Sequence, residues 1–203
     1  MDRWALTLIV LISLAARAVP AGAQGAVDEG MAAYQSGDYA KAVQLWRPLG
    51  ENGDVTAQYR LGIMYAEGKG VAPDDNEAFK WFQRAGEKGN AAAQYNVGAS
   101  YAGGIGVAKD DAEAAKWFRR AAEQGMPYAQ LNLGLLYAGG HGVPQNNVEA
   151  MTWFQLALFS LPPGAARSDV ARAMEDVSVK MTDQEREDAR DHVRAWKAKP
   201  EAK

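Results

Sequence analysis

The chain has 203 residues, a net charge of −3 and no cysteine, and 48% of its residues are apolar. The missing cysteines exclude disulfides, thiolate zinc sites and cysteine nucleophiles. The acidic balance lacks the basic surface that phosphate backbones require, so we expect no nucleic-acid partner. Glycine is frequent, at 21 residues, and there are six tryptophans. The positions of these two residue types indicate how the chain is organised.

Residues 1–23 have the pattern of a secretory signal. Arg3 supplies a positive start, residues 5–16 form an apolar run, and Ala21-Gly22-Ala23 is a small-residue site for cleavage after Ala23. The run is about 12 residues long, whereas a membrane-spanning helix needs ~20. The sequence therefore predicts a periplasmic or secreted protein with no stable membrane span after cleavage. The alternative is a signal that is kept as an anchor helix.

Residues 24–56 predict a short pair of helices. The first covers residues 26–36, and the second covers 39–51 after a tight turn at Gly37-Asp38. Ala42, Trp46 and Leu49 lie on one face of the second helix, as expected for a side that packs against a neighbour.

Residues 57–92, 93–128 and 129–164 are three copies of one unit. The first two are identical at 21 of 36 positions, and thirteen positions are shared by all three. In the first copy the shared residues are Ala57, Gln58, Gly62, Tyr65, Ala66, Gly68, Gly70, Val71, Glu77, Ala78, Trp81, Phe82 and Ala85. A fixed period of this length predicts a solenoid, in which each unit packs on the next.

Each copy divides into two predicted helices. The first carries an apolar face at Ala57, Leu61 and Tyr65. A glycine inside a helix costs about 1 kcal/mol relative to alanine, so its recurrence at Gly62 predicts that another helix passes very close. The second helix carries an apolar stripe that includes Trp81 and Phe82, and we expect these aromatic pairs to form a buried seam between consecutive helix pairs.

The loop between the two helices contains turn and capping residues. Gly68 or Gly70 is suited to the left-handed conformation that ends a helix. Asp74, Asp110 and Asn146 are suited to cap the second helix of the three copies.

The pattern weakens after Ala157, where Pro162-Pro163 interrupts the chain. Residues 165–197 predict two capping helices, the second of which begins after Thr182, and residues 198–203 predict a polar tail.

The pattern A-Q-x-x-L-G-x-x-Y-A-x-G-x-G-V, followed by E-A-x-x-W-F-x-x-A, resembles the Sel-one-like repeat family, with Val97 for leucine in the second copy. These repeats are relatives of the tetratricopeptide repeat. The resemblance implies an all-α, right-handed superhelical solenoid of antiparallel helix pairs, closed by a C-terminal helix pair. It also implies a protein-binding scaffold without catalysis or cofactor, rather than an enzyme.

Few residues suggest chemistry. His141 occupies a variable loop position and His192 lies on the charged face of the last predicted helix, so we expect both to be solvated. The acidic pairs Asp74-Asp75 and Asp110-Asp111 begin helices, where carboxylates favour the positive end of the dipole. We therefore expect no catalytic residue, cofactor or metal site. The alternative is a cell-envelope hydrolase, acting on peptidoglycan or a β-lactam, on the same repeats.

The predicted binding surface is the concave face, which the first helices of the repeats are expected to line. Asn side chains can donate to and accept from a peptide backbone, which suits a protein or peptide partner. The polar anchors are Arg60, Asn96 and Asn132; Tyr59, Tyr95 and Leu131 precede them, and Met64 and Ser100 lie one turn onward. We expect the chain to be a monomer.

Overall fold

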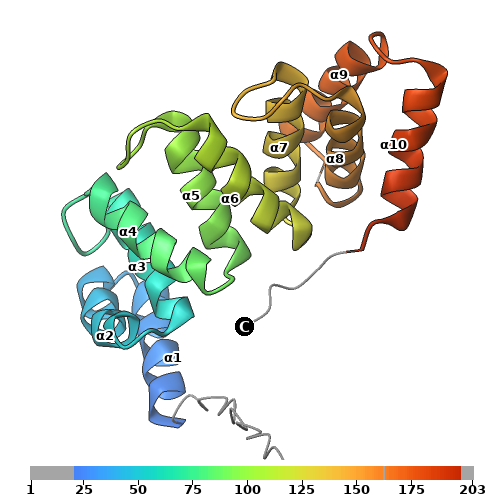
Figure 1. Ribbon diagram of the computed structural model, residues 1–203. Coiled ribbons are helices and arrows are strands. Elements are labelled where there is room, and N and C mark those ends of the chain that lie inside the picture. The colour runs from blue at the N-terminus through green and yellow to red at the C-terminus, as the bar shows by residue number, and fades with distance from the viewer. Residues whose placement is uncertain (1–20, 162, 198–203) are drawn as a thin grey trace, which may run out of the picture.

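The computed structural model describes residues 21–161 and 163–197, and this part of the chain is all-α. Its ten helices lie in a row from α1 at one end to α10 at the other (Figure 1). They are α1 (Ala21–Gln35), α2 (Tyr39–Glu51), α3 (Val55–Glu67), α4 (Asp75–Glu87), α5 (Ala91–Gly103), α6 (Asp111–Glu123), α7 (Pro127–Gly139), α8 (Asn147–Ser160), α9 (Ala165–Ser178) and α10 (Asp183–Ala195). The predicted solenoid of helix pairs is confirmed.

Residues 1–20 of the predicted signal and the whole of the predicted tail at 198–203 lie outside the described residues. Helix α1 begins at Ala21 and runs through the predicted cleavage position after Ala23. Among the helices of the described residues, none is both long enough and apolar enough to cross a membrane. The first helices of the three copies begin at Val55, Ala91 and Pro127, two residues before the starts chosen from the sequence.

The helix ends follow the predicted capping residues. Asp74 accepts hydrogen bonds from the backbone N–H groups of Asn76 and Glu77, both at 3.0 Å. Asp110 caps α6 with the same two bonds, and Asn146 caps α8 with one, from the Glu149 N–H. Both glycines of the loop, Gly68 and Gly70, are left-handed, with φ of 66° and 72°. The loop between the two helices is therefore fixed at both ends by the residues that the repeat keeps.

The glycine inside each first helix lies against the phenylalanine of the second helix of the same pair. A Cβ on Gly62 would stand 2.5 Å from the Phe82 ring, and one on Gly98 would stand 2.7 Å from the Phe118 ring. The same approach recurs between Gly134 and Phe154. The predicted close approach of another helix is confirmed, and the part of that helix nearest the glycine is the phenylalanine ring.

The tryptophan of each second helix packs between pairs. The ring of Trp117 lies 3.1 Å from the position of a Cβ on Gly86, which belongs to the preceding pair, and Trp117 is only 8% exposed. The predicted seam between consecutive pairs is confirmed for tryptophan, whereas phenylalanine makes its closest glycine contact within its own pair. Phenylalanine closes each pair, and tryptophan joins it to the pair before.

A buried glutamine also joins consecutive pairs. The side-chain amides of Gln58, Gln94 and Gln130 donate to the carbonyls of Gly50, Gly86 and Ala122, at 2.9, 3.0 and 3.2 Å. Each carbonyl lies near the end of the second helix of the preceding pair. This glutamine recurs in every copy, but the sequence pattern alone does not indicate its role.

The last two helices form where predicted but pack differently from the repeats. Thr182 caps α10 through a capping box with Glu185, and it stands 36 residues after the cap Asn146. Nevertheless, α9 and α10 both pack mainly on α8 rather than on each other. In Figure 1, α10 lies beside α8 at the far end of the row. The terminal pair therefore caps the core without closing on itself.

Candidate partner-binding surface

The first helices of the repeats present one face that the second helices do not cover. We call this surface, formed by α3, α5 and α7, the A-helix face. It contains six of the residues selected from the sequence, and all six are half-buried: Tyr59, Arg60, Tyr95, Asn96, Leu131 and Asn132. Half-burial leaves the polar ends of Arg60, Asn96 and Asn132 within reach of a partner while their stems pack on the helices.

Met64 does not belong to this face. It is fully buried, because Ala57, Leu61 and Met64 are spaced i, i+4, i+7 and form the stripe that packs against the first pair of helices. Including Met64 in the predicted surface was wrong. Ser100 stands at the same place in α5 and is half-buried, which puts it at the edge of the A-helix face.

Aromatic rings join this face to the core and to its neighbours. Tyr59 and Tyr95 lie against the phenylalanines of their own pairs, with ring centroids 5.9 Å from Phe82 and 5.8 Å from Phe118. Tyr95 also lies 6.3 Å from Tyr128 of α7. The A-helix face is therefore continuous from α5 to α7.

Two apolar residues of this face were not among those predicted from the sequence. Tyr128 and Leu135 are 39% and 45% exposed, and with Leu131 and Asn132 they fall at i, i+3, i+4 and i+7 of α7. Thr56 and Ala92 stand at the position of Tyr128 in the earlier copies. Comparing the copies at the positions around Asn132 would have found the change to apolar residues.

One polar atom of the A-helix face has no partner. The Arg60 Nε is buried, and no described residue accepts a hydrogen bond from it. A buried donor without an acceptor is costly, so the packing of the Arg60 stem is not fully satisfied in the free chain.

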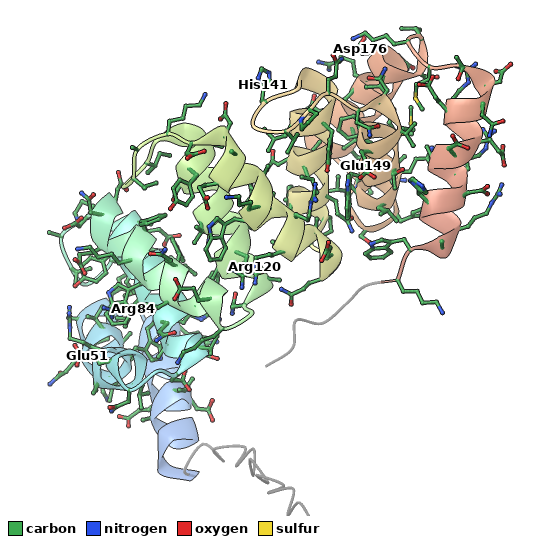
Figure 2. The ribbon with its side chains drawn as sticks, in the orientation of Figure 1. Glu51, Arg84, Arg120, His141, Glu149 and Asp176 are labelled. Carbon is green, nitrogen blue, oxygen red and sulfur yellow. The ribbon has the colours of Figure 1, made fainter. Side chains whose placement is uncertain are left out.

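The residues considered for catalysis are dispersed. His141 lies at the tip of the loop between α7 and α8 and points away from the helices (Figure 2). His192 is exposed on α10, and Asp74 and Asp110 are engaged as caps. The described residues hold no group of three or more His, Asp or Glu side chains that could bind a metal ion.

The perturbed pKa values belong to structural contacts. Hydrogen bonds to Glu67 and Tyr34 raise the pKa of Lys69. Lys69 thus connects its glycine loop to the first pair, with its Nζ 5.3 Å from the centres of the Tyr34 and Tyr39 rings. Burial raises the pKa of the Tyr101 and Tyr137 hydroxyls. The raised pKa values favour the charged form of Lys69 and the neutral form of the two tyrosines. They do not identify an acid–base pair.

Comparison with known protein families and curated proteins gives two results. Residues 55–90, 91–126 and 127–158 match the Sel1 repeat, which covers just over half of the chain. Two curated relatives, exopolysaccharide production negative regulators of Rhizobium leguminosarum bv. viciae and Rhizobium meliloti (strain 1021), are 43% and 45% identical over 51 residues. These residues are 25% of this chain and 19% of each regulator, so the match spans about a fifth of their length.

Solved structures show the same architecture. A Sel1 repeat protein from Oxalobacter formigenes matches with a TM-score of 0.66 and 31% identity, over 75% of this chain and 60% of that one. The protective antigen c5321 of uropathogenic Escherichia coli, with an SLR fold, matches with a TM-score of 0.56 and 27% identity, over 84% of this chain and 44% of that one. MamA AMB-1 matches with a TM-score of 0.51 and 19% identity, over 87% of this chain and 94% of that one. At this identity the likeness is one of fold alone.

Proposed function

Since the chain belongs to the Sel1 repeat family, we propose that it is a non-catalytic scaffold that binds a protein or peptide partner through its A-helix face. A Sel1 solenoid supports a role in protein interaction in general, because its stacked helices hold a long, rigid surface. The finer statement, that the partner lies along α3, α5 and α7, rests on the residues of that face.

The observation that carries this proposal is a line of half-buried polar residues, Arg60, Asn96 and Asn132, on one face of the array. These three residues stand at the same position of successive repeats, so their polar groups follow one line along the array. Tyr95, Tyr128 and Leu135 supply apolar area beside that line. Amide and guanidinium groups that alternate with aromatic rings suit an extended peptide, whose backbone needs donors and acceptors and whose side chains need apolar contact.

We further propose that the partner is met outside the cytoplasm. The support is the sequence of residues 1–23, with its apolar run and its small residues before Gln24. Purifying the chain from its source cell and sequencing its N-terminus tests this directly. A mature chain that begins at Gln24 supports export, and a chain that still begins at Met1 contradicts cleavage.

The alternative function, an envelope hydrolase, has one hollow that joins candidate groups, His192 with Glu123 and Glu149, where Glu149 accepts a hydrogen bond from the Trp153 indole at 3.0 Å. It needs an acid–base pair or a nucleophile within a shared hollow. The two histidines are exposed and lie on separate elements, and the acidic pairs begin helices. The curated relatives are regulators rather than hydrolases.

Capture of the partner with a double variant tests the proposed function. Asn96→Glu with Asn132→Glu places two carboxylates on the A-helix face without touching the buried stripe. We expect the partner captured by the unaltered chain from an envelope fraction to be lost. Asn52→Glu, at an exposed turn after α2, is the matched control and should retain it. Equal capture by the double variant would contradict a partner on this face.

A further inference from the structure

The C-terminal end of α8 departs from the repeat. The second helices end with Glu51, Glu87 and Glu123 at equivalent positions, and the next residue in this series is Phe159. Phe159 is 78% exposed, whereas aromatic side chains normally bury most of their area. A replacement of three carboxylates by one exposed ring indicates a change of function at this end of the array.

Two hollows lie near Phe159. The first is the α8–α10 groove, of about 390 Å³, with Met151 and Leu158 of α8 at its floor and Met174 of α9 and Arg190 of α10 on its walls. The second, of about 700 Å³, is lined by Leu156, Phe159 itself, Val193 and Trp196. Phe159 lines the second hollow and a smaller one formed with Gln155, Leu158 and Arg167, and Gln155 and Leu158 also line the α8–α10 groove. The two larger hollows are mainly apolar and of a size that takes several side chains.

The groove exists because the terminal pair lacks the contact that closes each repeat. Helix α9 contains no glycine and α10 contains no aromatic residue, and Arg190 stands 36 residues after Phe154. Without a ring that fits against a glycine, α10 packs on α8 instead of α9.

A buried acceptor in the second hollow has no partner. Gln130 is 2% exposed and lines this hollow, and its Oε1 receives no hydrogen bond from the described residues. In the preceding repeat the Oε1 of Gln94 accepts from Gln124 at 2.7 Å. Ser160 stands 36 residues after Gln124 and does not supply this hydrogen bond, and the Oε1 of Gln58 in the first copy is likewise buried without a partner among the described residues.

The rim around Phe159 is rich in arginine, although the whole chain is acidic. Arg167, Arg186, Arg190 and Arg194 line the hollows around it, with Glu175 as the single acid. Three of the four pair with carboxylates of α10: Arg186 with Asp183, Arg190 with Glu187, and Arg194 with Glu187 and Asp191. Arg167 is held by the carbonyls of Leu158 and Leu161, at 2.6 and 3.1 Å, so its positive charge is not neutralised by these bonds.

We propose that the α8–α10 groove and Phe159 form a second binding site, which takes an amphipathic helical segment of another protein with an acidic border. Apolar side chains of that segment enter the two hollows, carboxylates on its edge meet Arg167, and a polar hydrogen reaches the Gln130 Oε1. This site is separate from the A-helix face, so either can exist without the other.

The probe is a short, labelled, helix-forming peptide with leucine at i, i+3, i+4 and i+7 and glutamate along both edges. Fluorescence anisotropy measures its affinity for the full chain. We expect saturable binding, and we expect Phe159→Glu to weaken it by at least about tenfold, because one anchor ring is lost and a carboxylate meets those of the peptide. The variant should fold, since glutamate is the residue at the three equivalent positions.

Two matched controls follow. One tests whether binding depends on the charge of the peptide, and the other tests whether it depends on the position of the exposed ring. A peptide with lysine for every glutamate should bind far more weakly, because its charges meet arginines. Glu87→Phe puts a ring at the equivalent end of α4, where the pair is closed by Phe82, and should add no second site. The Asn96→Glu, Asn132→Glu variant should bind the acidic peptide normally.

Several outcomes would overturn the proposal. They are absence of saturable binding, equal affinity for the lysine peptide, and equal affinity after Phe159→Glu. Backbone amide shifts in NMR spectra that fall on α3, α5 and α7 instead of α8–α10 would also overturn it. So would much tighter binding after deletion of residues 198–203, which would make the tail of the chain the occupant.

Discussion

The three central repeats and the terminal pair use the same helix signals but reach different packing. In the repeats, each second helix begins at a capping Asp or Asn, and its phenylalanine lies against a glycine of the first helix. In the terminal pair, Thr182 provides an equally good cap, yet α10 leaves α9 and lies on α8. Helix formation and helix pairing are thus separate properties, and only pairing needs the glycine and the ring.

The difference also separates two kinds of surface. Between tightly closed pairs, the surface left for partners is the outward face of the first helices. Where the pair stays open, the surface is a groove with the exposed Phe159 beside it. Substitutions that strengthen or weaken the closed contacts should therefore affect the two regions unequally.

The largest expected effect is at the tryptophan seam. Trp117→Ala removes a ring packed on Gly86 and Gln94, beneath the Arg120 guanidinium at 4.4 Å from its centre, and should cost roughly 3–5 kcal/mol of unfolding free energy. Chemical denaturation measures it. Trp196→Ala, after the end of α10, is the control and should cost clearly less, because Trp196 is only half-buried. Equal losses would remove the distinction between the regions.

Next is the glycine that joins one loop to the preceding pair. Gly106 has φ of 68°, and a Cβ there would overlap the backbone carbonyl of Asp75. Gly106→Ala should therefore cost about 2–4 kcal/mol, from the left-handed conformation and the overlap together. Gly103→Ala, at the exposed end of α5 against the flexible Ile105 side chain, should cost nothing or gain up to ~1 kcal/mol. Thermal unfolding of the two variants checks the contrast.

A smaller loss is expected at the buried glutamine. Gln94→Leu keeps the apolar volume but removes the acceptor of the Gln124 amide, whereas the Gly86 carbonyl still accepts from the Gly89 N–H and from Arg120, so the loss should be about 1–2 kcal/mol. An unchanged denaturation midpoint would show that the glutamine does not hold consecutive pairs together.

The smallest effect is at the cap of α10. Thr182→Ala should cost roughly 1 kcal/mol.

Hydrogen bonds from Thr182 lower the pKa of Glu185 below its usual value. The stabilisation from the charged Glu185 is therefore present above its unfolded pKa of about 4.3 and is lost as pH falls through the folded pKa. Glu185→Gln should differ from the unaltered chain at neutral pH and converge with it in acid; a constant difference would contradict this.

Much of the fold follows from the sequence because the repeat fixes local geometry. The caps at Asp74 and Asp110 and the left-handed Gly68 are local, and each was predicted from the residue type. The ring against Gly62 could be inferred only as a close neighbour, because one sequence does not say which residue approaches.

The rest depends on tertiary packing. Met64 was misplaced because the buried stripe was assigned to Ala57, Leu61 and Tyr65. In the structure the third fully buried residue of that stripe is Met64. The open terminal pair could not be predicted, because α9 and α10 carry good helix signals and the missing contact is visible only against the closed repeats. The orphaned atoms of Arg60 and Gln130 likewise depend on neighbours far along the chain.

Native-state hydrogen exchange of the full chain compares the two regions most directly. The account predicts that amides in α4 and α6 exchange only on global unfolding, whereas those in α10 exchange through a lower-energy opening that leaves the repeats intact. The α10 amides should become protected when the acidic peptide is bound. Protection of α10 equal to that of α6 in the free protein would contradict an open terminal pair.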